Sequence, residues 1–223
     1  MITLHHLENS RSMRILWLLE ELGVEYQLIT SLRDPKTMLG PEEQTQVHPS
    51  GGWPVIEDGG VTLAESGAIT EYLLAKVGDE KWRPGPDSPH YTDYLYWLHF
   101  AESTLQPFSF MSLVFSRMPQ SAPGLIRPIL NKASKAVHQN FILPRSERYL
   151  GLADAHLAEN EFFAGDHPTG ADVMMIFTLE TSLSRFPNAK RYGHVLRYVR
   201  AIQARPAYQK ALAVGGRYDY API

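Results

Sequence analysis

Hydrophobic and polar positions follow two different periods along the start of the chain. A short apolar run from Ile2 to Leu7 predicts a strand, and apolar residues at helical spacing from Ile15 to Leu22 predict a helix that Gly23 ends. The run from Val24 to Thr30 predicts a second strand, and a right-handed crossover would place it parallel to the first. The pattern therefore predicts a β-α-β unit.

The next segment, from Arg33 to Pro49, is polar and interrupted by proline and glycine, so we expect an irregular connection with a short helix. Two apolar runs then flank Asp58-Gly59-Gly60, which is a typical hairpin sequence, so strands three and four should be antiparallel. Helical spacing returns at Ser66 and stops at Gly78. The order β-α-β-α-β-β-α predicts a thioredoxin-like domain over residues 1–78.

Residues 79–89 combine prolines, a glycine and charged residues, a composition that opposes regular structure and predicts a linker. After it the chain offers only helical patterns, over residues 91–115, 126–149 or beyond, 171–183 and 193–204, and we expect a loop at Pro206. A β/α region followed by helices alone is typical of two domains. We therefore expect an all-α domain over residues 90–223.

Charge and hydropathy narrow the classes of partner. The net charge of -3 leaves no basic surface for nucleic acid or for an anionic membrane, and no stretch approaches the ~18 apolar residues of a membrane span. Small molecules and other protein chains are the expected partners. The first residues lack the basic segment and apolar run of a secretory signal, so a cytoplasmic location is expected.

The chain contains 0 cysteines. Disulfides, cysteine-based zinc sites, cysteine nucleophiles and C-x-x-C redox motifs are therefore all excluded. Any thiol chemistry must use a thiol that a ligand brings.

Ser10 lies between the first strand and the first helix, where helix N–H groups favour an anion. A free thiol has a pKa of about 8.5, so holding it ionised at pH 7 requires roughly 2 to 3 kcal/mol. One hydroxyl donor contributes about 1 to 3 kcal/mol and a helix dipole up to about 2 kcal/mol, which is sufficient. On position alone, a helix-capping role for Ser10 or Ser12 is the simpler interpretation.

Two further turns carry polar backbone and side-chain groups. Trp53-Pro54 begins the third strand. A cis bond between these two residues would turn the Trp53 backbone outward, where it could pair with the backbone of a peptide ligand. The alternative is a trans proline in an ordinary edge strand. Glu65-Ser66 joins the fourth strand to the next helix and offers a carboxylate and a hydroxyl that match an α-amino acid head group. Plain helix capping by Ser66 is the alternative there.

Other motifs indicate structure rather than chemistry. Thr169-Gly-Ala-Asp172 matches a capping box that starts a buried helix. The histidines show no metal-site spacing, and the glycines show no nucleotide-binding motif, so no metal is expected. Aromatic residues at helical spacing between positions 91 and 115 form core or line an apolar pocket.

Over nearly its whole length, the chain resembles the glutathione transferase family. Four motifs carry this resemblance, in this order: Ser10-x-x-x-Arg14, His48-Pro-Ser-Gly-Gly-Trp-Pro54, Glu65-Ser66 and Gly165-Asp-x-x-Thr-x-x-Asp172. Residues 5–23, 96–102 and 205–212 resemble a serine-type branch of fungal and bacterial transferases that begins with HHL-x-x-SRS.

The resemblance implies a thioredoxin-like domain that binds glutathione, a helical domain that lines the electrophile site, and a homodimer active in detoxification. Thiolate conjugation to small apolar electrophiles, and reduction of organic hydroperoxides, would be the reactions. Ser10 would contact the thiol, with Asn9 and Arg11 as rivals. The backbone of Trp53 before a cis Pro54 would hold the cysteinyl unit, and Glu65-Ser66 the γ-glutamyl head.

One departure concerns the residues before the cis-proline. Family members commonly carry G-K-x-P there, whereas this chain has Gly52 and Trp53, so a contact to the glycyl carboxylate of glutathione is missing. Lys36 and His48 are candidate substitutes. On the helical side, the candidates for the electrophile pocket are His99, Glu102 and Gln106.

The altered Gly52-Trp53 also motivates a second hypothesis, a non-catalytic member that binds an apolar ligand or a protein partner. A glutathione-dependent isomerase or dehalogenase would use the same site. A glutaredoxin-like reductase is excluded, because a chain without cysteine forms no mixed disulfide.

Overall fold

A four-stranded sheet in the order β2-β1-β3-β4 forms the centre of the N-terminal half. The computed structural model describes residues 1–223. The strands are β1 (Ile2–Leu7), β2 (Tyr26–Ser31), β3 (Val55–Asp58) and β4 (Val61–Ala64). β1 pairs in parallel with β2 and antiparallel with β3, which pairs antiparallel with β4. The β-α-β unit and the hairpin predicted from the sequence are therefore confirmed.

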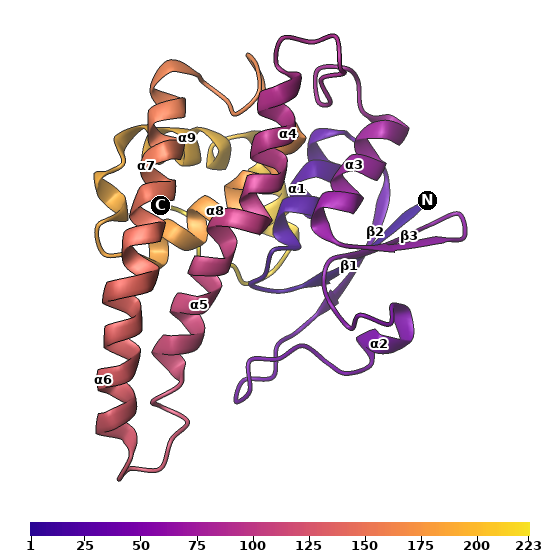
Figure 1. Cartoon of the computed structure of the whole chain (residues 1–223). Coiled ribbons are helices and arrows are strands. Elements are labelled where there is room, and N and C mark those ends of the chain that lie inside the picture. The colour runs from indigo at the N-terminus through magenta and orange to yellow at the C-terminus, as the bar shows by residue number, and fades with distance from the viewer.

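Three helices accompany this sheet, α1 (Met13–Glu21), α2 (Gln44–Val47) and α3 (Ser66–Val77). Figure 1 shows α1 and α3 together on one side and α2 on the other. The apolar positions of α1 are fully buried because this helix lies between the sheet and the helical half of the chain. The thioredoxin-like layout is confirmed.

Residues 78–90 contain no helix or strand, and every regular element after them is helical. These elements are α4 (Tyr91–Phe100), η1 (Ala101–Leu105), α5 (Gln106–Arg117), α6 (Arg127–Val137), η2 (His138–Ile142), α7 (Leu143–Glu159), α8 (Gly170–Arg185), η3 (Ala189–Arg191), α9 (Gly193–Gln203) and α10 (Pro206–Val214). The lower ends of α5 and α6 extend away from the sheet as a long hairpin (Figure 1). The expected all-helical character is confirmed.

Two details differ from the sequence expectations. The helices expected over residues 91–115 and 126–149 each contain one π-helical segment, η1 and η2, and run on to Arg117 and Glu159. The segment after Pro206 was expected to be a loop and is instead α10. Proline fits the first turn of a helix, because the N–H that it lacks would have no partner there.

Helix α8 is the centre of the molecule and is buried along nearly its whole length. It packs against α1 and α3 of the N-terminal half and against α4 and α5 of the helical half. The capping box predicted at its start is present, with Asp172 accepting from the Thr169 N–H at 2.8 Å. Asp172 also accepts from the Phe163 N–H and the Tyr198 hydroxyl, so it joins α8 to the preceding loop and to α9.

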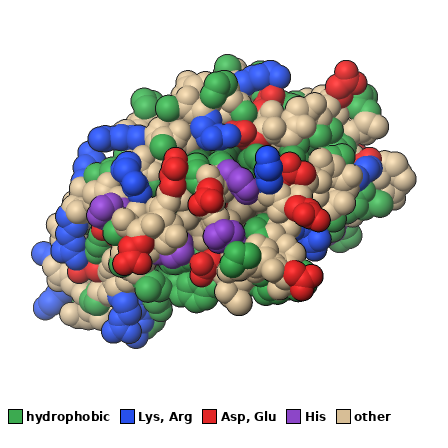
Figure 2. All heavy atoms as spheres, turned by 90° about the horizontal axis from the view of Figure 1, so that it is seen from above, with side chains coloured by type: hydrophobic (Ala, Val, Ile, Leu, Met, Phe, Trp, Pro, Cys, Tyr) green, Lys and Arg blue, Asp and Glu red, His purple; other side chains and the backbone are tan.

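The surface carries both signs of charge. Figure 2 shows acidic side chains and histidines across the middle of one face and basic side chains mainly toward one end, with hydrophobic side chains between them. No helix of the structure is long and apolar enough to cross a bilayer.

Candidate active site

A cavity of about 320 Å³ opens between the two halves of the chain, at the turn that follows β1. The N-terminal half contributes Leu7, Asn9, Ser10, Arg11, Arg33, Thr37, Met38, Leu39 and Trp53. The helical half contributes Gln106, Phe110, Leu113, Val114, Arg117, Phe177, Arg185 and the C-terminal Tyr220. Nine of these 17 residues are hydrophobic, and a cavity that combines apolar walls with polar groups is typical of a small-molecule site.

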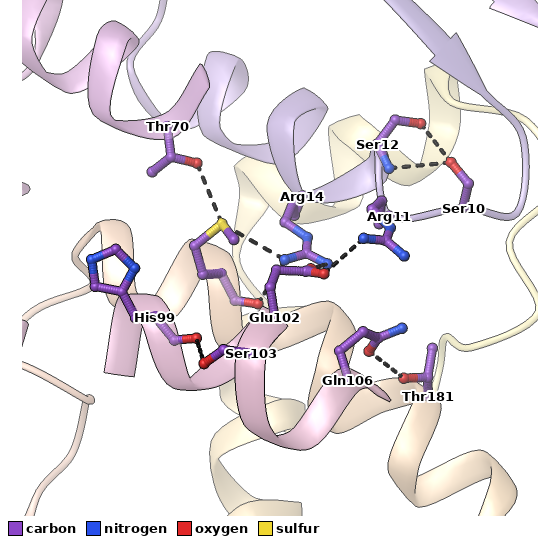
Figure 3. A network of polar contacts seen from close by, with 11 residues as sticks. Ser10, Arg11, Ser12, Arg14, Thr70, His99, Glu102, Ser103, Gln106 and Thr181 are labelled. Atoms are coloured by element: carbon purple, nitrogen blue, oxygen red, sulfur yellow. Dashed lines mark hydrogen bonds and ion pairs between the residues drawn. The ribbon is translucent and has the colours of Figure 1, made fainter. Parts of the chain in front are cut away.

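Ser10 lies in the wall of this cavity, and its hydroxyl is already engaged within the protein. Ser10 Oγ lies 2.7 Å from the Leu7 carbonyl oxygen and 2.8 Å from Ser12 Oγ, and it accepts from the Ser12 N–H (Figure 3). Ser12 Oγ lies 2.7 Å from Nδ1 of His6, whose Nε2 donates to the Gly215 carbonyl at 2.8 Å. Because a carbonyl only accepts, His6 carries its proton on Nε2, and its Nδ1 accepts a hydrogen bond from the Ser12 hydroxyl.

The backbone beside Ser10 supplies additional donors. The N–H groups of Ser10 and Arg11 have no acceptor in the protein, and both lie in the turn just before α1. Free N–H groups at the start of a helix stabilise an anion. A thiolate bound at this turn would thus meet one reorientable hydroxyl and two fixed N–H groups.

Asn9 also lines the cavity, but its side chain is bound to the C-terminal tail. Its Nδ2 donates to Asp219 at 2.7 Å, and its Oδ1 accepts from the Asp219 N–H. Asn9 adopts a φ of 51°, a left-handed conformation that asparagine tolerates better than most residues. Its position therefore favours shaping the loop over contacting a ligand.

Arg11 belongs to an ion-pair cluster between the two halves. Arg11 and Arg14 each lie 2.7 Å from a different oxygen of Glu102, and the Arg14 side chain is fully buried (Figure 3). Burial alone would raise the pKa of Glu102, but the charges of Arg14 and Arg11 outweigh it and lower that pKa. Glu102 therefore remains ionised and compensates the buried guanidinium.

The turn before β3 brings Gly52, Trp53 and Pro54 to the same end of the sheet. The Trp53-Pro54 bond is cis, as the family resemblance implies. The Trp53 ring packs so closely on Gly40 that a Cβ there would lie 2.4 Å from it. The buried Nε1 of Trp53 has no hydrogen-bond partner in the protein.

At the start of α3, Glu65 and Ser66 differ in exposure. Glu65 is exposed and has a φ of 74°, a strained conformation for a residue other than glycine that is often found at functional sites. The buried Ser66 Oγ has no partner in the protein. Glu65 and the neighbouring Gly67 line a second hollow of about 380 Å³ against α4.

Lys36 and His48 lie away from the cavity. Lys36 is exposed in the loop after β2, where its backbone N–H donates to Asp34. His48 Nδ1 lies 2.9 Å from the Ser50 hydroxyl at the end of α2. Neither side chain lines the cavity beside Ser10.

The three candidates from the helical half are separated. Gln106 lines the cavity together with Ser10, and its Oε1 accepts from Thr181 at 3.3 Å. Glu102 and the exposed His99 line the second hollow, beside Glu65. The structure therefore places Gln106 in the same cavity as Ser10, and Glu102 and His99 near the start of α3.

Among the cavity residues that sequence reasoning did not identify are Arg33, Arg117, Arg185 and Tyr220. They come from the end of β2, the end of α5, the end of α8 and the C-terminal tail. No spacing in the sequence joins them. No group of His, Asp and Glu side chains lies together in a way that could hold a metal ion.

Comparison with known proteins matches both halves. The family model for the glutathione S-transferase N-terminal domain covers residues 1–75, and the model for the C-terminal domain covers residues 117–206. Glutathione S-transferase 3 of Schizosaccharomyces pombe is 35% identical over 93% of this chain and 85% of its own.

Comparison with solved structures points to the same family. A glutathione S-transferase from Actinobacillus pleuropneumoniae is 31% identical, with a TM-score of 0.78 over 100% of this chain and 97% of its own. A transferase homologue from Lodderomyces elongisporus, solved with two glutathione molecules per subunit, shares the fold at 21% identity and a TM-score of 0.74, over 94% of this chain and 96% of its own. The chain belongs to the glutathione S-transferase family.

Proposed function

We propose that glutathione lies across the end of the sheet, with its γ-glutamyl head at Glu65 and Ser66, its cysteinyl backbone against Trp53, and its thiol beside Ser10. The thiolate then attacks a small electrophile, or an organic hydroperoxide, in the cavity of about 320 Å³.

The observation that carries this proposal is the buried Ser66 hydroxyl without a partner at the start of α3. A buried polar group left unpaired is unfavourable by about 1 to 3 kcal/mol, so such a group is commonly satisfied by a ligand. A carboxylate fits it well, because the N–H groups at the start of a helix favour an anion. The exposed Glu65 carboxylate beside it would pair with an ammonium group.

At the other end, the free N–H groups of Ser10 and Arg11 suit the sulfur. These two donors and the Ser10 hydroxyl support a serine-type site. In this pose the glycyl end would point toward the segment between β2 and β3. Lys36 and His48 lie in that segment and stay candidates for a contact to the glycyl carboxylate.

Calorimetry with glutathione tests this pose. Ser66→Ala should weaken glutathione binding about 10-fold, since a hydrogen bond to a charged group contributes about 1.5 kcal/mol or more. The Ser66→Ala variant should keep the thermal stability of the wild type, because the Ser66 hydroxyl has no partner in the protein. Ser184→Ala, an exposed serine on α8, is the matched control. Equal affinity of all three proteins would contradict the pose, and binding without turnover of any electrophile would support a ligand-binding role instead.

We further propose a homodimer. Leu95 and Tyr96 on α4 and Leu152 on α7 are 38%, 49% and 44% exposed, and they line one shallow apolar hollow. Exposed apolar surface of this kind is typical of a subunit interface. Sedimentation should give twice the chain mass of 25.2 kDa for the wild type, and Tyr96→Glu should shift it toward the monomer. A cytoplasmic location and a role in detoxification stay predictions from the family.

A further inference from the structure

The cavity beside Ser10 is unusually basic for a site with apolar walls. Arg11, Arg33, Arg117 and Arg185 all line it, and no acidic residue does. The whole chain has a net charge of -3, so this concentration of positive charge is local.

Only one of these four arginines has an ion-pair partner. Arg11 pairs with Glu102, whereas the guanidinium groups of Arg33, Arg117 and Arg185 have no carboxylate oxygen within 4.0 Å. Arg33 donates to the carbonyl groups of Glu8, Asn9 and Met38. Its hydrogen bonds therefore hold the loops at the cavity mouth.

Arg117 and Arg185 are the cations with free donors. Arg185 donates to the Ser109 carbonyl at 3.2 Å and to the Tyr220 hydroxyl at 2.8 Å, which leaves several of its N–H groups unused. The side chain of Arg117, at the last turn of α5, has no hydrogen bond or ion pair within the protein and is exposed. Both extend from the helical half, on the wall that faces the turn of Ser10.

The environment of these cations is electrostatically unfavourable without an anion. Burial lowers the pKa of Arg33 and of Arg185, Tyr220 opposes this lowering in both, and the nearby charge of Arg117 adds to it. Glu8 contacts the backbone N–H of Arg33 and does not line the cavity. An anionic ligand would relieve the mutual repulsion of the three cations.

The remaining walls indicate the body of that ligand. Phe110, Leu113, Val114 and Phe177 lie on the same side of the cavity as the two arginines. Planar guanidinium groups bind carboxylates through paired hydrogen bonds, and aromatic walls favour a flat apolar body.

We propose that the second substrate is an aromatic electrophile that carries a carboxylate, which Arg117 and Arg185 hold while the reactive carbon faces Ser10. This inference rests on the proposed function. With an aryl halide, the glutathione sulfur forms a bond to the ring carbon, the halide leaves with its electron pair, and the thiol proton passes to solvent.

A matched pair of probes tests this selectivity: 4-chloro-3,5-dinitrobenzoate and the corresponding neutral benzamide. In Arg117→Gln, KM for the benzoate should rise about 10-fold, and KM for the benzamide and for glutathione should stay within about twofold. Added salt should raise KM for the benzoate more in the wild type than in Arg117→Gln. The Arg117 side chain is exposed and makes no hydrogen bond or ion pair in the protein, so the variant should fold normally.

Arg148→Gln is the control, because it removes the same charge from an exposed position on α7 outside the cavity. The proposal is overturned if Arg117→Gln changes KM for both probes equally, or for neither. It is also overturned if only KM for glutathione rises, since the arginines would then hold a carboxylate of the tripeptide. Failure of the wild type to conjugate either probe would instead count against the proposed function.

Discussion

The hydroxyl oxygens of Ser10 and Ser12 lie 2.8 Å apart, and this contact determines where the Ser10 proton points. The Ser12 hydroxyl donates its hydrogen bond to Nδ1 of His6, so toward Ser10 it can only accept a hydrogen bond. In the free protein the Ser10 proton is directed to Ser12 or to the Leu7 carbonyl, and not into the cavity. Ser10 must therefore reorient its hydroxyl to stabilise a thiolate, whereas the N–H groups of Ser10 and Arg11 are free from the start.

Glu102 should be important for stability because it compensates the buried Arg14. Glu102→Gln removes the charge that lies 2.7 Å from the fully buried guanidinium of Arg14. Loss of one partner of a buried ion pair destabilises a protein by about 3 to 5 kcal/mol, and we expect about 3 kcal/mol here because Glu102 is partly exposed. Urea unfolding measures the change.

The exposed Glu159→Gln on α7 is the control for that experiment, since Glu159 has no ion pair. The wild type should also lose stability as the pH falls below about 4.5, the ordinary pKa of a glutamate, because the folded-state pKa of Glu102 is lowered. Wild-type stability in Glu102→Gln would contradict the role of this carboxylate.

Asp172 should affect folding more than chemistry. Asp172→Asn replaces one carboxylate oxygen with an N–H donor, which then faces either the Thr169 donors or those of Phe163 and Tyr198. We expect a loss of about 2 to 4 kcal/mol in the free energy of unfolding. The kcat of the folded fraction should stay near that of the wild type. Asp166→Asn, exposed and without contacts, should be neutral; equal losses in both variants would contradict the prediction.

Glu180 should make stability depend on pH near neutrality. Burial raises its pKa from 4.5 to about 7, against the opposing effect of hydrogen bonds from Tyr208, Tyr218 and Gln203. Because the folded state holds the proton more tightly than the unfolded state, this group makes stability fall as the pH rises from about 4.5 to about 7. Glu180→Gln removes the titrating group, so the slope of Tm against pH in this window should flatten. An identical slope in both proteins would contradict the assignment.

The sequence predicted the elements whose signals are local. The β-α-β unit, the Asp58-Gly59 hairpin and the Thr169 capping box each depend on residues within a few positions of one another. Helix α10 was missed because Pro206 was interpreted as a helix breaker rather than as a first-turn residue. The π-helical segments η1 and η2 could not be predicted, because each is too short to change the hydrophobic periodicity of the sequence.

The site was predictable only in part. Ser10, Trp53 and Ser66 each follow or precede a strand or helix, so their turns could be recognised from the sequence. The basic wall could not, because Arg33, Arg117 and Arg185 are far apart in the chain and meet only after α5, α8 and the loop after β2 have packed. The hydrogen bonds of Asn9 to the C-terminal tail could not be predicted for the same reason, since Asp219 lies 210 residues away in the sequence.

We propose that the Ser10 hydroxyl helps to keep the glutathione thiol ionised. The direct measurement is the pKa of the bound thiol, followed by thiolate absorbance against pH, in the wild type and in Ser10→Ala. One lost hydroxyl donor to a charged sulfur should raise this pKa by about 1 to 2 units and lower turnover by about 10- to 100-fold, with little change in glutathione affinity. An unchanged pKa and unchanged turnover would contradict the claim and transfer the role to the N–H groups of the turn.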